Sequence, residues 1–230
     1  MDNVGTPMRA DLHAHALPAS GDSRASVEQL AGAAADLGLE AVALTDHGPA
    51  DLYAASAVFQ AHGVRMIPGR EVSCDLGHVV VLATDLDWLA ALPPRCSLPL
   101  PNSRRGPAAL IWAHPAGWRT GGTMIPPDPS RGAEYLHAVE VLNGERLHQE
   151  GGVELAAGLA AQLGLPGCGG SDAHDAPALG RCLTEVERAD GTEEFIEGVA
   201  AGRGRPVLSE RWALARGYDY RRPDLIPYLR

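Results

Sequence analysis

The chain has 230 residues, of which 45% are hydrophobic and 21% are charged, a composition typical of a globular protein and not of a disordered one. Its formal net charge of -10 disfavours long nucleic acids as partners, because their binding depends on basic side chains that neutralise phosphates. All 19 basic residues are arginine, which excludes a P-loop lysine, a Schiff-base lysine and a carboxylated-lysine metal bridge.

Length and terminal composition predict the domain organisation and the location. The chain is long enough for one substantial core and shows no linker or internal repeat, so we expect a single domain over 1–230. Residues 208–230 form a polar, arginine-rich tail. The first ten residues do not resemble a signal peptide, no apolar run could span a membrane, and the four cysteines form no CxxC pair. We therefore expect a cytoplasmic protein that does not enter a membrane.

In chain order, short apolar runs alternate with helix-like stretches, as expected of βα units around a parallel sheet or barrel. We expect strands over residues 8–13, 40–45, 64–68, 78–84, 109–113, 138–142 and 166–169. The helix after the first strand has Ser26 as N-cap, Gln29 completing a capping box and Gly38 at its end. Further helices, each followed by glycine, are expected over 49–62, 150–163 and 192–201. Residues 93–107, with five prolines, and the Gly- and Pro-rich residues 116–129 are expected to be loops.

Metal-ligand side chains recur where the expected strands end. His13 and His15 close the first strand, and because strand side chains alternate, the two point to the same face. Such a pair alone is more often structural than functional. Ligand types also stand at the ends of later strands, at His47, Glu71, His114, Asp172 and His174. In βα-barrel enzymes these strand ends converge on the active site, so we expect the side chains to meet in space.

His78 begins its strand instead of ending it. If the third and fourth strands form a hairpin across the six residues between Glu71 and His78, the start of one strand lies beside the end of the other. His78 is then expected to face the same cluster.

The ligand types predict the metals. Six histidines with glutamate and aspartate, and no cysteine, suit Zn, Mn or Fe, whereas calcium or magnesium alone would call for mostly oxygen ligands. Eight ligands are too many for one tetrahedral ion, and a carboxylate such as Glu71 can bridge two ions roughly 3.5–4 Å apart. We therefore expect at least two divalent transition-metal ions.

These motifs together resemble the PHP family, named for polymerase and histidinol phosphatase domains, from about Arg9 to Pro206. The matching pieces are Asp11-Leu12-His13-Ala14-His15, Asp22 with Ser26, Thr45-Asp46-His47, Gly69-Arg70-Glu71, Gly77-His78, Ala113-His114-Pro115, Glu140-Val141-Leu142-Asn143-Gly144 and Gly170-Ser171-Asp172-Ala173-His174. The resemblance implies an α/β fold, a distorted, TIM-like (β/α)7 barrel, with up to three metal ions on its C-terminal face.

The resemblance also implies which residues share an ion. One ion would be held by His13, His15, Glu71 and Asp172. A second would be held by Glu71, His78 and His114, with Glu71 bridging the two ions. The third would be held by Asp22, His47 and His174.

Other residues are expected to act beside the metal ligands. Asp46, next to His47, is expected to orient a ligand or water and, with Glu71, to serve catalysis. Three arginines near the strand ends are candidates to bind phosphate oxygens: Arg70, Arg119 and Arg181. Arg119 is favoured because it lies in the loop after His114, which could fold over the barrel mouth.

The predicted function is hydrolysis of a small phosphomonoester by attack of a metal-bound hydroxide on phosphorus. One alternative is a 5′–3′ exonuclease or an oligonucleotide or nucleotide phosphodiesterase. A second is hydrolysis of C–N bonds of the amidohydrolase kind, which the missing lysine disfavours. A third is a catalytically silent metal-binding barrel that serves as an interaction module. The oligomeric state is left open.

Overall fold

The computed structural model describes residues 7–101, 104–115, 118–119, 122–123, 128–130, 134–187, 189–220, 222 and 224–229. The strands are β1 (Met8–Ala14), β2 (Ala41–Leu44), β3 (Arg65–Cys74), β4 (Gly77–Ala83), β5 (Ala108–Trp112), β6 (Trp118–Arg119), β7 (Gly122–Thr123), β8 (Ala138–Asn143), β9 (Gly167–Gly170), β10 (Cys182–Val186) and β11 (Gly204–Leu208). The helices are α1 (Val27–Leu37), α2 (Leu52–Ala61), α3 (Leu86–Ala91), α5 (Gly152–Leu163), α6 (Thr192–Ala200) and α7 (Glu210–Arg216), with 3₁₀ turns η1 (Gly144–Arg146), η2 (Ala176–Ala178) and η3 (Ile226–Tyr228).

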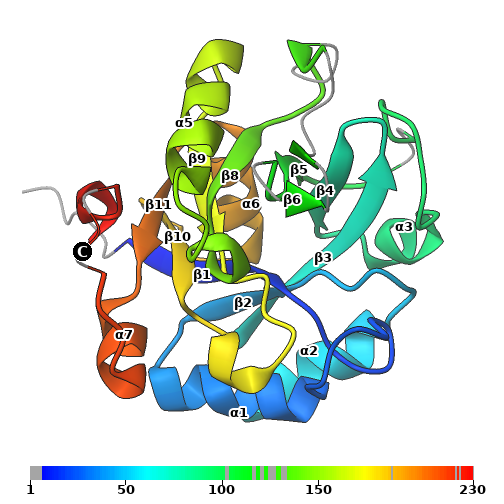
Figure 1. Ribbon diagram of the computed structural model, residues 1–230. Helices are drawn as coiled ribbons and strands as arrows, with labels where there is room; N and C mark the ends of the chain where they lie inside the picture. The colour runs from blue at the N-terminus through cyan, green and yellow to red at the C-terminus, as the bar shows by residue number, and fades with distance from the viewer. Residues whose placement is uncertain are drawn as a thin grey trace, which may run out of the picture.

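One sheet organises the molecule, with strand order β11-β10-β1-β2-β3-β4-β5-β8-β9 (Figure 1). The end of the sheet that carries β9 curls back toward β1. Ala173, just after β9, forms a bridge with Ala14 of β1, and the His15 amide donates to the Ala173 carbonyl at 2.9 Å. The Thr184 hydroxyl of β10 also bonds the backbone of Gly169 on β9 at 2.8 Å. The sheet is therefore a nearly closed barrel, and the α/β barrel prediction is confirmed.

Alanines and larger aliphatic side chains such as Ile67, Leu82 and Ile111 together fill the inside of the barrel. Six of its buried interior residues are alanines: Ala10, Ala41, Ala43, Ala109, Ala113 and Ala138. The remaining space at one end is filled by α6, whose Phe195, Ile196 and Val199 are fully buried in the same cluster as Met8 at the start of β1. Because α6 covers the ends of the barrel where the parallel strands begin, their carboxyl ends are left to form the site.

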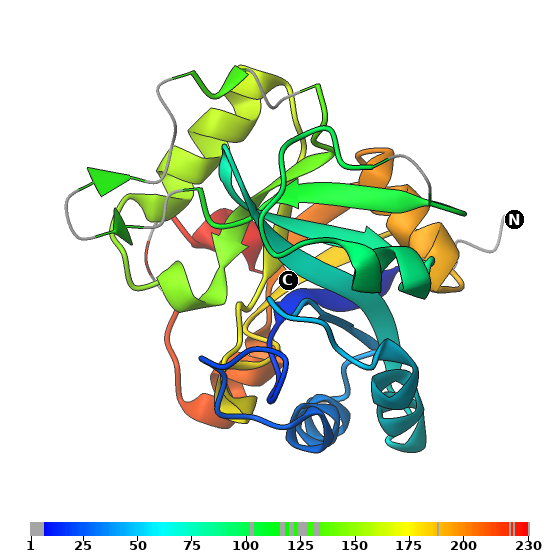
Figure 2. The same ribbon diagram turned by 90° about the vertical axis from the view of Figure 1, so that its right-hand side faces the viewer.

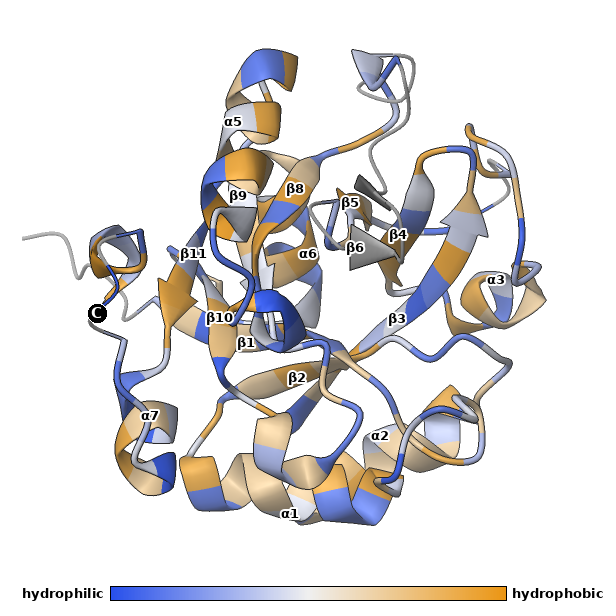
Figure 3. Cartoon of the chain, viewed as in Figure 1, coloured by the Kyte–Doolittle hydropathy of each residue, from blue (hydrophilic) through white to orange (hydrophobic). Residues whose placement is uncertain are grey.

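The other helices cover the outside of the barrel. Figures 1 and 2 show α1 and α2 side by side under β2 and β3, and α5 on the opposite side over β8. The capping box predicted for α1 is present, with Ser26 accepting from the Gln29 amide at 3.2 Å, and Gly38 ends the helix in the left-handed conformation. Hydrophobic stretches run along β2 and β8, while polar and hydrophobic residues mix along α1 and α5 (Figure 3). No helix in the described part of the chain is both long and apolar enough to cross a membrane.

Six strands and helices were not predicted. Two of them, β6 and β7, are two-residue strands that pair with each other within residues 116–129, which were expected to be a loop. The strands β10 and β11 pair with each other and extend the sheet beyond β1, and Pro206 is tolerated because β11 is an edge strand. The helices α3 and α7 begin at the N-caps Asp85 and Ser209 but have only 6 and 7 residues, too short for a periodic pattern to appear. The tail therefore contains a helix and the turn η3. The single-domain expectation stays a prediction.

Glu185 joins three neighbouring strands at the surface of the barrel. Its carboxylate lies 2.7 Å from Arg9 Nε on β1 and 2.6 Å from Arg205 Nε on β11. Burial alone would raise the pKa of Glu185, but these two guanidinium groups lower it below its usual value. The carboxylate is therefore ionised and ties β10 to both of its neighbours.

Candidate metal centre

An irregularity in β1 turns its two histidines toward the barrel mouth. Met8, Ala10 and Leu12 face the barrel interior, and the pairing of β1 with β2 shifts register between Asp11 and Ala14. Such a shift resets the alternation of side chains along a strand. After it, His13 and His15, both fully buried, point to the site.

The first group of donors surrounds one point. The Nε2 atom of His13 lies 3.5 Å from Glu71 Oε2 and 3.4 Å from Asp172 Oδ1, and that of His15 lies 3.5 and 3.3 Å from the same two oxygens. Ligands of a tetrahedral zinc ion with bonds of about 2.0–2.1 Å lie about 3.3–3.4 Å apart. The spacing of these four donors therefore suits a transition-metal ion.

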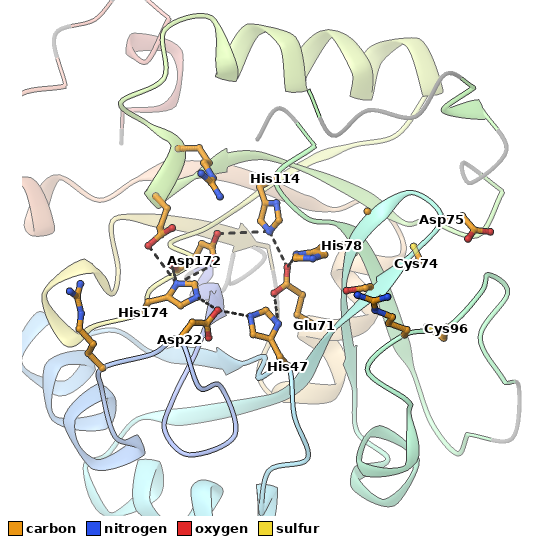
Figure 4. Close-up of a pocket in the computed structure, with 16 residues that line it drawn as sticks. Asp22, His47, Glu71, Cys74, Asp75, His78, Cys96, His114, Asp172 and His174 are labelled. Atoms are coloured by element: carbon orange, nitrogen blue, oxygen red, sulfur yellow. Dashed lines mark hydrogen bonds and ion pairs between the residues drawn. The ribbon is translucent and has the colours of Figure 1, made fainter. Parts of the chain in front are cut away.

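The second group shares Glu71 with the first. Glu71 Oε1 lies 2.9 Å from His78 Nδ1 and 3.0 Å from His114 Nε2 (Figure 4). The predicted hairpin is present, since β3 and β4 are antiparallel with Ser73 opposite His78. One carboxylate thus directs one oxygen to each donor group, which is the arrangement needed for a bridging ligand.

The third group lies nearest to solvent. Asp22 Oδ2 is 3.3 Å from His47 Nε2 and 3.4 Å from His174 Nε2 (Figure 4). The His15 ring is stacked between the rings of His47 and His174, with centroid separations of 4.5 Å on each side. The side chains of Asp22, His47 and His174 are 56%, 35% and 19% exposed, whereas the first four donors are almost fully buried.

Hydrogen bonds fix which ring nitrogen is free to bind a metal. His15 Nδ1 lies 3.2 Å from the Ser20 hydroxyl, which itself donates to Asp46 Oδ1 at 2.7 Å, so Nδ1 must be the donor. His13 Nδ1 likewise faces Glu140 Oε1 at 3.1 Å. The Nε2 atoms of His13 and His15 are buried without a hydrogen-bond partner. Both Nε2 atoms face the Glu71 and Asp172 carboxylates of the first donor group, so these residues fit a metal ion.

The site is electrostatically coupled. Burial alone would raise the pKa values of Glu71 and Asp172, but the neighbouring histidines, His13 above all, lower both well below their usual range. Burial lowers the pKa of His15 to about 4. Burial also opposes protonation of His174, but its contacts with Glu145 and the Asp172 carbonyl raise its pKa to about 9. Both carboxylates are ionised in the centre, as metal ligands need to be.

Supporting residues hold the donors in place. Glu140 Oε2 accepts from the His114 amide at 2.8 Å and from Asn143 Nδ2 at 2.9 Å, and Asn143 also donates to Asp172 Oδ2 at 3.2 Å. These contacts hold His114 and Asp172 at positive φ values of 31° and 54°, a strained backbone typical of functional sites. Sequence reasoning noted Glu140 and Asn143 only through the family motif.

Two further supporting residues, Ser20 and Asp11, were not assigned roles. Ser20 accepts from His15 and from the His47 amide, so Asp46 reaches the donors through it. Asp11 is fully buried and accepts from the amides of His13, Ser171 and Gly180. A serine and an aspartate have no specific role that the sequence alone reveals. The contacts of Ser20 with Asp46 and His47, and those of Asp11 with Ser171 and Gly180, join residues far apart in the chain.

A cavity of about 740 Å³ opens over the donors. Its walls include Asp22, His47, Glu71, His78, His114, Asp172 and His174 on one side, and Cys74, Asp75 and Cys96 on the other (Figure 4). The predicted loop over 93–107 contributes Arg95 and Cys96, because the Cys96 amide bonds the Ser73 carbonyl of β3 at 3.0 Å.

The structure places the predicted phosphate-binding arginines elsewhere. Arg70 lies behind the site, where its guanidinium donates to the carbonyls of Leu89, Ala90 and His47. Arg181 donates to the Gly144 carbonyl at 2.7 Å. Neither lines the cavity, because backbone carbonyls already engage both guanidinium groups.

The predicted role of Arg119 concerns a side chain that lies outside the described part of the structure, as does most of the loop over 116–129. Among the described side chains, the arginines that line the cavity are Arg24, Arg95 and Arg146.

Barrel fold and clustered donors together define a metal-dependent hydrolase. Residues 11–95 match the PHP domain model, and residues 153–203 match a second model described as PHP-associated. The chain belongs to the PHP family, as its motifs predicted.

Similar proteins cover nearly the whole chain. Two proteins named probable phosphatases, from Thermoanaerobacter sp. (strain X514) and Thermoanaerobacter pseudethanolicus (strain ATCC 33223 / 39E), are each 26% identical over 238 residues, covering 87% of this chain and 94% of theirs. The crystal structure of PsfC from Pseudomonas syringae PB-5123 has a TM-score of 0.67 at 19% identity, covering 93% of this chain and 96% of PsfC. A candidate metal-dependent phosphoesterase from Bifidobacterium adolescentis ATCC 15703 has a TM-score of 0.56 at 15% identity, covering 73% of this chain and 88% of its own.

Proposed function

We propose that this PHP-family hydrolase acts on phosphate esters and that its substrate is a small phosphomonoester. The observation that carries the proposal is the shared donor set, in which Glu71 lies within 3.5 Å of five histidines. So many neutral and anionic donors exceed the needs of one ion. They suit two or three ions of Zn, Mn or Fe.

Each donor group has a distinct place in this proposal. The first ion is assigned to His13, His15, Glu71 and Asp172, the second to Glu71, His78 and His114, and the third to Asp22, His47 and His174. When bound, such ions supply an activated water and neutralise charge on phosphoryl oxygens. Glu71 would be a ligand of both the first and the second ion, and Asp46 keeps His15 oriented through Ser20.

Arg146 is the arginine best placed to bind the phosphate. It lines the cavity together with His114 and Asp172, and its Nε atom is buried without a hydrogen-bond partner. Its backbone amide donates to Asn143 Oδ1 at 3.2 Å, which fixes it to the residue that also holds Asp172. Arg24, by contrast, pairs with Asp175 at 2.9 Å and is 79% exposed. A half-buried guanidinium whose Nε has no acceptor among the described residues is suited to an anionic ligand.

Charge favours a small substrate over a polymer. The net charge of -10 opposes the counterion release on which long strands depend. At the centre, two or three divalent ions would outweigh Asp22, Glu71 and Asp172 and attract a small dianion. The names of the two Thermoanaerobacter relatives agree with a phosphatase.

A substrate comparison tests the proposal. Protein loaded with Mn, Zn or Fe is given sugar, amino-alcohol and nucleoside monophosphates, and in parallel single-stranded RNA and DNA ladders. We expect release of inorganic phosphate from the monoesters and intact ladders. Stepwise shortening of the ladders with untouched monoesters would instead establish the exonuclease. Absence of hydrolysis by fully metal-loaded protein would support the silent barrel.

A further inference from the structure

The C-terminal segment, the described residues from 209 to 229, is linked to the metal centre through Arg181. The guanidinium carbon of Arg181 lies 4.3 Å from the centre of the Trp212 ring and 5.3 Å from that of Tyr218. Cation–π contacts of this kind hold a guanidinium in one orientation. In that orientation Arg181 donates to the Gly144 carbonyl at 2.7 Å. The aromatic residues of the C-terminal segment thus aim Arg181 at the turn η1.

Two more contacts tie this segment to the loops of the site. Trp212 Nε1 donates to the Pro177 carbonyl at 3.0 Å, in the loop that follows His174. Arg222 donates to the Leu147 carbonyl, directly after η1. The segment therefore holds both the η1 turn and the loop after β9.

The η1 turn in turn contacts the third donor group. Gly144 lies so close to Ser171 that an added Cβ would come within 2.5 Å of the Ser171 carbonyl oxygen. The Glu145 amide donates to that same carbonyl at 3.1 Å. The Glu145 carboxylate lies 3.5 Å from His174 Nδ1. A continuous set of contacts thus runs from Trp212 through Arg181 and η1 to His174.

The third group is the most exposed of the three, and Glu145 adds a second contact to His174 Nδ1, which also bonds the Asp172 carbonyl at 2.9 Å. Its side chains are partly exposed, whereas the donors of the first group are locked by burial and by direct contacts with Glu140, Asn143 and Ser20. We propose that Arg181 is a positioning residue for the Asp22–His47–His174 metal site, held by the aromatic side chains of the C-terminal segment and acting through the η1 turn and Glu145. This proposal rests on the assignment of that metal site in the proposed function.

The test measures metal binding directly. Full-length apoprotein is titrated with Mn²⁺, and free Mn²⁺ is followed by electron paramagnetic resonance. The change is Arg181→Met, which removes the donor but keeps a side chain to pack on Trp212. Asp22→Asn marks which ion belongs to the third site. The matched control is Arg211→Met. Arg211 lies on α7, next to Trp212, and its guanidinium also donates to a backbone carbonyl, that of Asp36 at 3.1 Å, away from the metal centre.

We expect Arg181→Met to lower the affinity for one Mn²⁺ ion by about tenfold or more, as for other residues that orient ligands. This ion should be the same one whose binding Asp22→Asn weakens. The other ions should bind as in wild type, Arg181→Lys should recover part of the loss, and Arg211→Met should bind like wild type. The KM for a phosphomonoester should rise in Arg181→Met.

Three results would overturn the proposal. The first is wild-type affinity for every ion in folded Arg181→Met. The second is an equal weakening of all ions together with a large fall in the melting temperature, which indicates a structural role only. The third is an Asp22→Asn protein that binds every Mn²⁺ ion with wild-type affinity. The titration uses no substrate. A failure to hydrolyse phosphomonoesters would therefore contradict the proposed function without changing the interpretation of the Mn²⁺ affinities.

Discussion

Glu71→Gln is the sharpest test of the metal centre, because it changes charge and one donor atom at nearly constant volume. Glu71 directs Oε2 to His13, His15 and His47, and Oε1 to His78 and His114. An amide keeps only one oxygen. Whichever way the glutamine side chain turns, its NH₂ group faces one of the two donor groups, and that group loses a ligand.

The magnitude follows from the role of the lost oxygen. Residues that only orient a ligand cost about 10–100-fold in metal affinity or activity when they are replaced. Loss of a ligand itself should exceed this range, so we expect at least about 100-fold weaker binding of one ion, or about 2.8 kcal/mol. Metal content after desalting and turnover of a phosphomonoester should fall together. Elemental analysis and a phosphate-release assay on the same preparation measure both.

Glu185→Gln is the matched control, since Glu185 is an equally buried glutamate far from the centre. It should keep the wild-type metal content. If Glu71→Gln is folded and retains wild-type metal and turnover, the bridging assignment of Glu71 is wrong.

Four further outcomes are expected. Protein purified without chelators should contain two to three transition-metal ions per chain by elemental analysis, and one ion or none at full occupancy contradicts the three-group centre. Asp46→Asn should lower turnover with little loss of metal, because Asp46 contacts Ser20 and no donor atom of the centre; loss of both together would make it a ligand. Gly170→Ala should lower the free energy of unfolding by about 1–3 kcal/mol and lower the metal content, because its Cβ would lie 2.6 Å from His13 Cβ. A free energy of unfolding and a metal content equal to those of wild type would show that the added methyl group does not displace His13. Glu185→Gln should destabilise the fold by about 1 kcal/mol at pH 7, since its two arginine partners are partly exposed. Because the folded pKa of Glu185 is lowered, its contribution is present above the unfolded value near 4.5 and is lost as pH falls through the folded pKa. The denaturation curves of the two proteins should therefore converge as the pH falls below about 4.5.

Much of the barrel could be predicted because its signals are local. Short apolar runs located β1 to β5, β8 and β9, and the capping box located the start of α1. The extension of β3 to Cys74 was missed, since it depends on antiparallel pairing with β4. The strands β10 and β11 were missed because their partners lie on β1 and on each other, which a local pattern does not reveal.

The arginines show where local reasoning fails. Arg70 and Arg181 lie beside ligand motifs in sequence, yet both guanidinium groups donate to backbone carbonyls. Arg146, which no motif singled out, reaches the cavity instead. The direction of a long side chain depends on which carbonyl or ring lies within its reach, and this is decided by packing between distant segments.

The sequence by itself determined the chemistry of the centre: histidines and carboxylates at successive strand ends, without lysine or paired cysteines. It also determined the order in which the donors occur at the ends of successive strands. The alternation of side chains along a strand and the glycines that end the helices are local features of the sequence. Only the tertiary structure decided which oxygen of Glu71 faces each donor group, that the pairing of β1 with β2 shifts register before His13 and His15 reach the site, and that the C-terminal segment reaches η1 through Arg181. These features are separations of a few ångströms between residues far apart in the chain, and they exist only once the sheet has closed and its neighbours have packed around it.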